Sequence, residues 1–379
     1  MCSFKIRHRL VVTLCMLSPL FCAAQEPAVS HEVSYLSFQV PGALGTYPMS
    51  VNSTMAVTGY YYVSSTVTGG FLHDAGGAIT TFSVRDGLWT EPESINDAGD
   101  ITGFYEVVAG VPQGFLRYAD GRIVTFEPPT SRTLLPQAQP VSINAFDKIA
   151  GNYPFPNPAS IAGFTRSRAG VFTTIGFGDG GAYSTVVTGL NASGTVVGYG
   201  ESDVDLFSFI SDPDGASTLF ALPKVGGECD NYRQSTVAET INADGVIAGL
   251  YSLYIDPCVT MTVGGFVRSP QGVFTLFSPP GTIVTLPVEP GLVFGGETLT
   301  PPHQLSINQA GTITGSYVDA EGAKHGFVRN PYGTITSFDP PRGRQTTATS
   351  INDCGVIVGS YYYDWNNQIA EGFLRVPQP

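Results

Sequence analysis

Short runs of alternating apolar and polar residues fill the chain after about the first thirty positions. Val, Ile, Thr, Tyr and Phe recur in these runs, and Gly, Pro, Asn and Asp separate them. Alternation with a period of two is typical of β-strands that bury one face, and the separators are turn formers. After the N-terminus, no long stretch places apolar residues at i, i+3, i+4 and i+7, the spacing of a helix. The pattern predicts an all-β protein.

The runs belong to a repeat whose plainest copy is SINQAGTITGSYVDAEGAKHGFVRNPYGTITSFDPP, residues 306–341. Alignment on the Asn gives seven copies spaced by 44 to 66 residues, each with Val or Ile five residues later and Gly seven residues later. Two strands joined by a short turn account for this spacing, with the Asn and the residues after it forming the turn. The asparagines are Asn52, Asn96, Asn144, Asn191, Asn242, Asn308 and Asn352.

A second pair of strands follows in each copy. We label the four strands A (before the Asn), B (through the Gly), C and D. Strand C carries Phe71, Phe115, Phe164, Phe209, Phe266, Phe327 and Phe373. Strand D is expected to end on Phe82, Phe126, Phe177, Phe220, Phe277 and Phe338, eleven residues after the strand C Phe except in the third copy, where the spacing is thirteen. Each copy therefore predicts a four-stranded antiparallel sheet, which is one blade of a β-propeller.

The seventh copy has no strand D of its own. The missing sequence stands at the other end of the chain, where SYLSFQVP (34–41) matches TITSFDPP, and Phe38 precedes Asn52 by 14 residues just as Phe338 precedes Asn352. An N-terminal strand that joins the C-terminal blade closes a ring and removes exposed sheet edges. We therefore expect residues 25–379 to form a single seven-bladed β-propeller domain.

The motifs SINDxGxIxGxY, HGFxR and TITSFDPP resemble the probable extracellular HAF-type repeats of exported bacterial proteins, with Gly-Phe in place of His-Ala-Phe. The resemblance covers about residues 33 to 376. It implies an exported repeat protein and brings no catalytic or binding residues with it.

Residues 1–24 have the pattern of a secretory signal peptide. Three basic residues precede an apolar run over 10–21, and Cys22-Ala23-Ala24 suits cleavage after Ala24. The alternative is an uncleaved membrane anchor, but the run is interrupted by Ser18 and Pro19 and is short for a bilayer core of about 30 Å. We expect an exported protein, located outside the cell, at its surface or in the periplasm, with no membrane span in the mature chain.

Charge narrows the range of partners. Without the segment 1–24 the chain would have 15 basic and 31 acidic residues, a net charge of −16. Nucleic acid is not expected as a partner, because phosphate backbones are bound by basic surfaces.

In an exported chain Cys229 and Cys258 are expected to form a disulfide, with two free buried thiols as the alternative. Cys354 is expected to be a small buried apolar residue.

Insertions relative to the repeat indicate where a ligand could bind. They fall at 221–241, 252–263 and 278–305, in D–A crossovers and one B–C loop, which lie on the same face of a propeller. Variable loops on a constant scaffold are the usual place for binding. Candidate ligand-binding residues on this face are Trp89, Trp365, Asp364, Tyr232 and Glu228. Aromatic rings beside carboxylates suit sugars; the alternative is that these aromatics only pack the blades.

A recurrent arginine on strand C could form an anion-binding ring, but pairing with nearby carboxylates such as Glu127 or Asp339 is the preferred interpretation. The histidines occupy non-equivalent positions, so no metal site, cofactor or catalytic residue is predicted.

The leading hypothesis is a non-enzymatic scaffold that binds carbohydrate or protein. The alternatives are a secreted glycan-cleaving enzyme with a carboxylate pair on the insertion face, and a structural surface protein without a discrete ligand.

Overall fold

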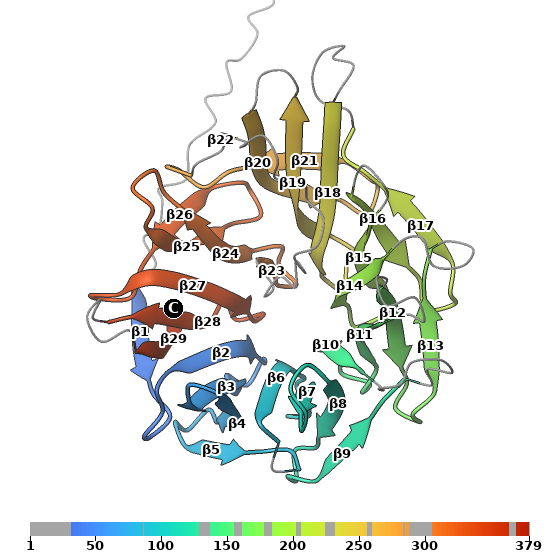
Figure 1. Ribbon diagram of the computed structural model, residues 1–379. Helices are drawn as coiled ribbons and strands as arrows, with labels where there is room; N and C mark the ends of the chain where they lie inside the picture. Colours follow the sequence, from blue (N-terminus) through green and yellow to red (C-terminus); the bar gives the residue numbers. More distant parts are fainter. Residues whose placement is uncertain are drawn as a thin grey trace, which may run out of the picture.

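The computed structural model describes residues 32–85, 87–128, 137–154, 161–177, 184–201, 206–223, 232–255, 260–282, 285–287, 305–363 and 369–378. These residues form seven antiparallel sheets arranged in a ring (Figure 1), each with at least four strands. The predicted seven-bladed β-propeller is therefore confirmed.

The first three blades follow the chain from the innermost strand outward. Blade 1 is β2 (Thr46–Val51), β3 (Val57–Ser64), β4 (Val67–His73) and β5 (Ile79–Phe82). Blade 2 is β6 (Trp89–Ile95), β7 (Ile101–Glu106), β8 (Pro112–Arg117) and β9 (Ile123–Phe126). Blade 3 is β10 (Gln139–Ile143), β11 (Ile149–Pro154), β12 (Ile161–Arg166) and β13 (Phe172–Ile175).

The next three blades repeat this order, and blade 5 has an additional short strand. Blade 4 is β14 (Thr185–Leu190), β15 (Val196–Glu201), β16 (Leu206–Ser211) and β17 (Ser217–Phe220). Blade 5 is β18 (Tyr232–Ile241), β19 (Ile247–Ile255), β20 (Thr260–Arg268) and β21 (Phe274–Phe277), with β22 (Thr285–Pro287) paired to β20. Blade 6 is β23 (Leu305–Ile307), β24 (Ile313–Val318), β25 (Lys324–Arg329) and β26 (Ile335–Phe338).

Blade 7 joins the two ends of the chain, as the sequence predicts. It contains β27 (Arg344–Ile351), β28 (Ile357–Tyr362), β29 (Ala370–Pro377) and, on the outside, β1 (Val33–Phe38). In Figure 1 the blue first strand lies beside the red last strands. Phe38 is opposite Gly372 in the same register in which Phe338 is opposite Gly326. The N-terminal strand therefore takes the position of an ordinary strand D.

Apolar residues between neighbouring blades form the core. Seven clusters of buried side chains occur, one for each of the seven contacts between adjacent blades. The repeated strand C phenylalanine is at most 2% exposed in every blade. The glycine before it is required because a Cβ atom at Gly326 would lie 2.5 Å from the ring of Phe338. The Gly-Phe motif therefore lets the strand D aromatic pack flat on its own blade.

The repeated asparagines connect the blades. Each buried Asn side chain accepts a hydrogen bond at Oδ1 from the backbone N–H four residues later, as Asn308 does from Thr312 at 2.9 Å. Its Nδ2 donates to the backbone carbonyl of the Asn in the next blade, as Asn308 does to Asn352 at 3.1 Å. The last bond of the series runs from Asn352 to Asn52 at 2.8 Å. Seven inter-blade bonds of this kind close a ring.

Two details of the predicted repeat are wrong. Strand β13 ends at Ile175, which pairs with Gly163 in the register of the other blades, so Phe177 lies beyond strand D and the C–D spacing does not vary. The insertion at 252–263 is mostly strand rather than loop, since β19 and β20 in blade 5 have nine residues each, against six in β24 and β25.

The strand C arginines are structural, but their partners differ from those expected. Each strand C arginine stacks on the strand D phenylalanine of the preceding blade. In Arg329 the guanidinium carbon lies 5.2 Å from the centroid of the Phe277 ring. The same contact recurs at Arg117, Arg166, Arg268 and Arg375. The face of an aromatic ring attracts a cation, so the guanidinium can be stabilised there without a carboxylate partner. The expected pairing of these arginines with carboxylates such as Glu127 and Asp339 is therefore wrong.

Cys354 is a free, exposed thiol in the A–B turn of blade 7, so its expected burial is also wrong. The backbone N–H of Cys354 donates a hydrogen bond to Oδ1 of Asn352. This bond fixes the turn in a shape that leaves the Cys354 side chain exposed. Residues 1–24, Ala24 included, lie outside the described residues, as do Cys229 and Cys258.

Candidate functional site

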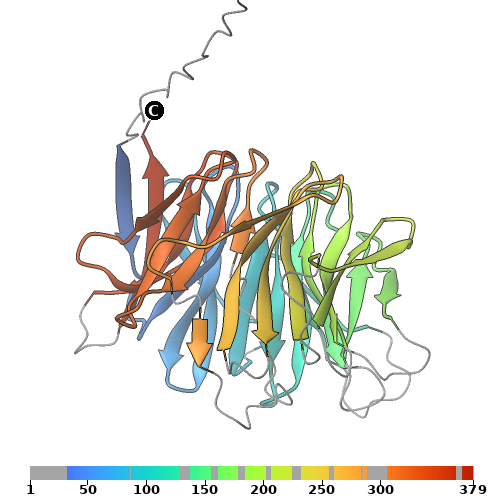
Figure 2. The same ribbon diagram turned by 90° about the horizontal axis from the view of Figure 1, so that it is seen from above.

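The strands of every blade run between two faces of the disc, which is seen from its edge in Figure 2. We call the face with the A–B and C–D turns the turn face, and the face with the B–C turns and D–A crossovers the loop face. The insertions predicted to carry function lie on the loop face wherever the structure describes them, at the ends of β18, β19 and β20 and at β22.

Of the predicted binding residues, only Trp89 has a described side chain. It begins β6 on the loop face, is 38% exposed, and donates from Nε1 to the carbonyl of Thr66 at 3.0 Å. The indole thus anchors the B–C turn of blade 1 to blade 2. Tyr232 begins β18, of which only the backbone is described there. Trp365, Asp364 and Glu228 lie outside the described residues.

A cluster of tyrosines lies toward the loop-face end of blade 1. Tyr47 of β2 stacks on Tyr60 of β3, with ring centroids 5.0 Å apart and an angle of 12° between the planes. Tyr62, two residues further along β3, meets both rings edge-on at 5.6 and 6.0 Å. Tyr362 of blade 7 interacts with the hydroxyl of Tyr47. Four aromatic side chains from two blades are therefore grouped near the inner strands.

Two glutamates of the neighbouring blade act electrostatically on Tyr60. Glu91 lies on the innermost strand β6, and Glu93 is the extra residue of the β-bulge between Pro92 and Ser94. Both are largely enclosed by protein but keep part of their surface accessible to water. Neither has a hydrogen-bond or ion-pair partner among the residues that the structure describes. We call Tyr47, Tyr60, Tyr62, Tyr362, Glu91 and Glu93 the tyrosine–glutamate cluster.

Burial without a partner shifts the pKa values in this cluster. Burial, together with the charge of Glu106, raises the pKa of Glu91 to about 7. The pKa of Glu93 is raised well above its usual range by burial and then by the charge of Glu91. Burial, followed by the charges of nearby acidic groups including both glutamates, also raises the pKa of Tyr60. Perturbed ionisable groups of this kind mark functional sites more often than scaffold positions.

The cluster consists of departures from the repeat. Tyr47 and Glu91 occupy the same position, five residues before the Asn, where other blades have Gln139, Val186 or Thr347. The repeated tyrosine is a different one, nine residues after the Asn; Tyr105, Tyr153 and Tyr361 at that position are buried in the core. Sequence reasoning overlooked Tyr47, Tyr60, Glu91 and Glu93 because it searched the insertions for function. The signal lay in polar and aromatic residues at strand A positions that the scaffold does not specify.

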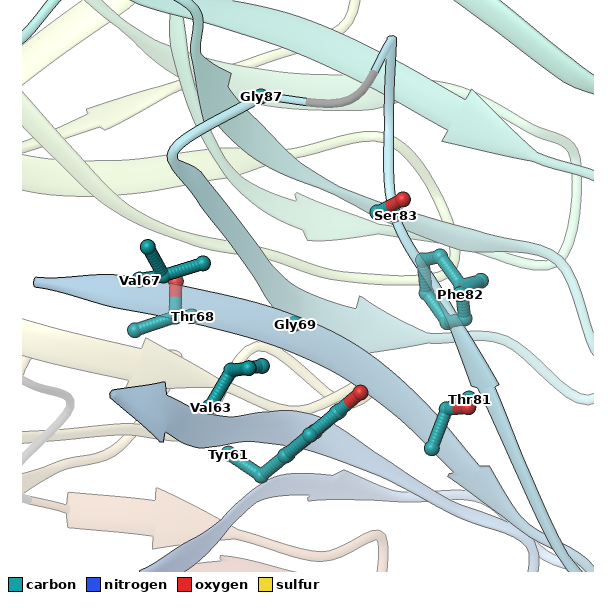
Figure 3. A pocket seen from close by; sticks show the side chains of 9 residues that line it. All are labelled: Tyr61, Val63, Val67, Thr68, Gly69, Thr81, Phe82, Ser83 and Gly87. Carbon is teal, nitrogen blue, oxygen red and sulfur yellow. The ribbon is translucent and has the colours of Figure 1, made fainter. Parts of the chain in front are cut away.

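A pocket of about 460 Å³ lies on blade 1, also toward the loop face. Its walls come from β3, β4, β5 and the crossover to blade 2, and Figure 3 shows the Tyr61 ring lying across it with its hydroxyl toward β5. The lining residues are Tyr61, Val63, Val67, Thr68, Gly69, Thr81, Phe82, Ser83 and Gly87. The described residues that line it include no carboxylate and no basic group, so they supply neither a general acid–base pair nor a charged anchor.

In the described ranges, no three His, Cys, Asp or Glu side chains come together as they would around a metal ion. The described part of the chain likewise contains no helix with the length and apolar character needed to cross a bilayer.

No family model matches the sequence, and no curated protein matches it at a significant level. Solved structures do match by shape. A mutant of AofleA from Arthrobotrys oligospora is 11% identical, with a TM-score of 0.36 over 87% of this chain and 82% of that one. Aleuria aurantia lectin, solved with alpha-methyl-L-fucoside, is 9% identical, with a TM-score of 0.38 over 81% of this chain and 94% of that one.

A third match is dipeptidyl peptidase 4 from Porphyromonas gingivalis, which is 11% identical with a TM-score of 0.45. The alignment covers 84% of this chain and 50% of the peptidase. All three TM-scores are below 0.5, so these likenesses carry no argument about ligand or reaction.

Proposed function

We propose that this protein is an exported binding scaffold that recognises carbohydrate at the tyrosine–glutamate cluster. The observation that carries the proposal is the grouping of four tyrosine rings with two unpartnered carboxylates at positions that the repeat does not require. The export is proposed from the pattern of residues 1–24.

The chemistry of the cluster suits a sugar. The apolar face of a pyranose ring stacks on an aromatic ring, and the tyrosine hydroxyls can exchange hydrogen bonds with sugar hydroxyls. A carboxyl group accepts hydrogen bonds from sugar hydroxyls in either charge state and can also donate one when it is protonated, so Glu91 and Glu93 suit a ligand rich in hydroxyl groups. Hydrogen bonds to a charged acceptor are stronger than neutral ones. Since neither carboxylate has a partner among the described residues, a ligand would not have to displace one.

A glycan array followed by calorimetric titration tests the proposal. Tyr62→Ala removes a ring that is not part of the Tyr47–Tyr60 stack, and we expect it to weaken glycan binding at least about tenfold. Tyr332→Ala is the matched control, because Tyr332 is a 94% exposed tyrosine in the C–D turn of blade 6, on the turn face. Glycan affinity that is unchanged in Tyr62→Ala and Tyr60→Ala would contradict the proposal.

Glycan cleavage is a second candidate, favoured by the raised pKa of Glu91. A general acid works best with a pKa near the working pH, and glycosidases need one carboxyl group as an acid and another as a base or nucleophile. Because the charge of Glu91 raises the pKa of Glu93, Glu93 would hold the proton and donate it to the leaving oxygen, and Glu91 would act as the second carboxylate. Product analysis after incubation with every glycan that binds decides between the two: turnover that is lost in Glu91→Gln supports the enzyme, and binding without turnover rejects it.

A further inference from the structure

We infer that the tyrosine–glutamate cluster selects amino sugars whose nitrogen is a free, protonated amine. The inference rests on the proposed carbohydrate binding and adds a ligand class to it. A neutral sugar needs hydrogen-bond acceptors, but it does not need two ionisable groups held together without a counter-ion. A cationic ligand would offset the free-energy cost of ionising Glu91 and Glu93 close together in an enclosed place.

Among the described residues, no basic side chain forms an ion pair with Glu91 or Glu93. The charges that act on Glu91 and Glu93 are acidic, from Glu106 and from Glu91 respectively. Glu106 itself accepts a hydrogen bond from the backbone N–H of Gly110 at 2.8 Å and brings no positive charge. On the far side of the tyrosines, Arg344 lies opposite Tyr362 in blade 7, and Arg342 donates to the hydroxyl of Tyr363. Neither arginine forms an ion pair among the described residues.

The tyrosines complete the match to a cation. Tyr47 and Tyr60 cover one face of each other, and Tyr62 meets both rings edge-on. The remaining face of such a ring attracts an ammonium group. A protonated amine beside Glu91 and Glu93 would favour their ionised forms, because a nearby opposite charge lowers the pKa of a carboxyl group. The ion pair that results is screened less in a partly enclosed site than in water. An N-acetyl group carries no charge and would leave both carboxylates unpaired. The cluster therefore favours the deacetylated form of a hexosamine over the acetylated form.

Two oligosaccharides with the same backbone provide the test. We would titrate the full-length exported protein with a β-1,4-linked glucosamine hexamer and with the matching N-acetylglucosamine hexamer, at near-neutral pH and moderate salt. We expect the deacetylated hexamer to bind at least about tenfold more tightly. Glu93→Gln should lower that affinity at least about tenfold, whereas Glu321→Gln, the same change on an exposed residue of the loop face, should leave it unchanged.

The outcomes separate the inference from the proposed function. Equal or tighter binding of the acetylated hexamer overturns selection of the amine but leaves carbohydrate binding in place. Equal losses in Glu93→Gln and Glu321→Gln show general attraction to an acidic surface and also overturn the inference. Failure of both hexamers and of the whole glycan array to bind overturns the inference together with the proposed function. Thermal unfolding of each variant confirms that a loss of affinity is not a loss of fold.

Discussion

At the scale of single residues, the repeated Asn uses both ends of its amide. Oδ1 holds the A–B turn of its own blade, and Nδ2 reaches the carbonyl of the next blade. The turn role could be predicted from sequence, because Asn followed by Asp, Ser or Gly is typical of turns. The bond to the next blade could not, because it joins residues 44 to 66 positions apart along the chain, or 300 at the closure.

The two roles can be separated with Asn308→Asp. This change keeps the Oδ1 acceptor and removes the Nδ2 donor, so it leaves the Asn352 carbonyl facing a carboxylate. We expect a loss of about 1 to 3 kcal/mol in the free energy of unfolding, measured by chemical denaturation. Asn330→Asp is the control, since Asn330 uses only Oδ1 in its turn, at 2.9 Å from the N–H of Thr334. If both variants match the wild type, the asparagines serve their turns alone.

The unpartnered glutamates predict a dependence of stability on pH. The pKa of Glu91 is raised from 4.5 to about 7 in the folded protein, so the folded state holds this proton more tightly than the unfolded state does. Its stabilising contribution is fully present below the unfolded pKa and is lost as the pH rises through about 7. Glu91→Gln cannot ionise and should gain stability relative to the wild type between about pH 5 and pH 8. A stability difference that stays constant over this range would show that Glu91 is not enclosed.

At the scale of strands, the bulge in strand A explains the repeated Gly of strand B. The register shifts by one residue just before the Asn in most blades, as between Val187 and Gly189, and this brings the backbone of strand A close to strand B. A Cβ atom on Gly198 would lie 2.0 Å from the carbonyl oxygen of Val186. Sequence could predict the invariant Gly but not this close approach, since alternation does not reveal where an extra residue enters the ladder.

Alanine substitutions test this explanation. Gly198→Ala requires the two strands to separate, and overpacking of this kind costs about 1 to 3 kcal/mol or more. Gly176→Ala is the control, because a Cβ atom there meets nothing within 4 Å and the backbone is not left-handed. We expect a clearly lower melting temperature for the first variant and little change for the second. Equal melting temperatures would mean that the Gly is not needed for strand packing.

The same scale shows how far sequence could locate the site. The placement of Trp89 on the loop face followed from the repeat, but the repeat put it in the D–A crossover, whereas it begins β6. The grouping of Tyr47 with Tyr60 did not follow from the repeat, because it depends on the twist and bulge that turn these side chains toward each other across β2 and β3. The position of Glu93 could not be predicted from sequence either, because a β-bulge residue does not follow the alternation of inward and outward side chains along a strand.

At the scale of the whole molecule, the two chain ends share one sheet. Strand β1 closes blade 7, and Phe38 packs edge-on against Phe71 of blade 1 with ring centroids 5.8 Å apart. The closure could be predicted because the strand D motif is missing at one end of the sequence and present at the other. It makes the N-terminal strand part of the fold rather than an extension of it.

Closure predicts that changes at the N-terminus destabilise the whole ring. Phe38→Ala should cost about 2 to 3 kcal/mol, since a half-buried aromatic side chain is removed from the contact between blades 7 and 1. Leu36→Ala is the control on the same strand, because Leu36 is 59% exposed. Deletion of residues 34–41 should lower the melting temperature further still. Thermal unfolding that is unaffected by the deletion would show that β1 does not close the ring.

We propose that repeated residues build the scaffold, whereas departures from the repeat build the binding site. Thermal unfolding and glycan titration of the same two variants test it most directly. We expect Asn308→Asp to lose stability but to keep its glycan affinity at temperatures where it is folded. We expect Tyr62→Ala to keep most of its stability but to lose glycan affinity. Loss of glycan affinity in folded Asn308→Asp, with normal affinity in Tyr62→Ala, would contradict the claim.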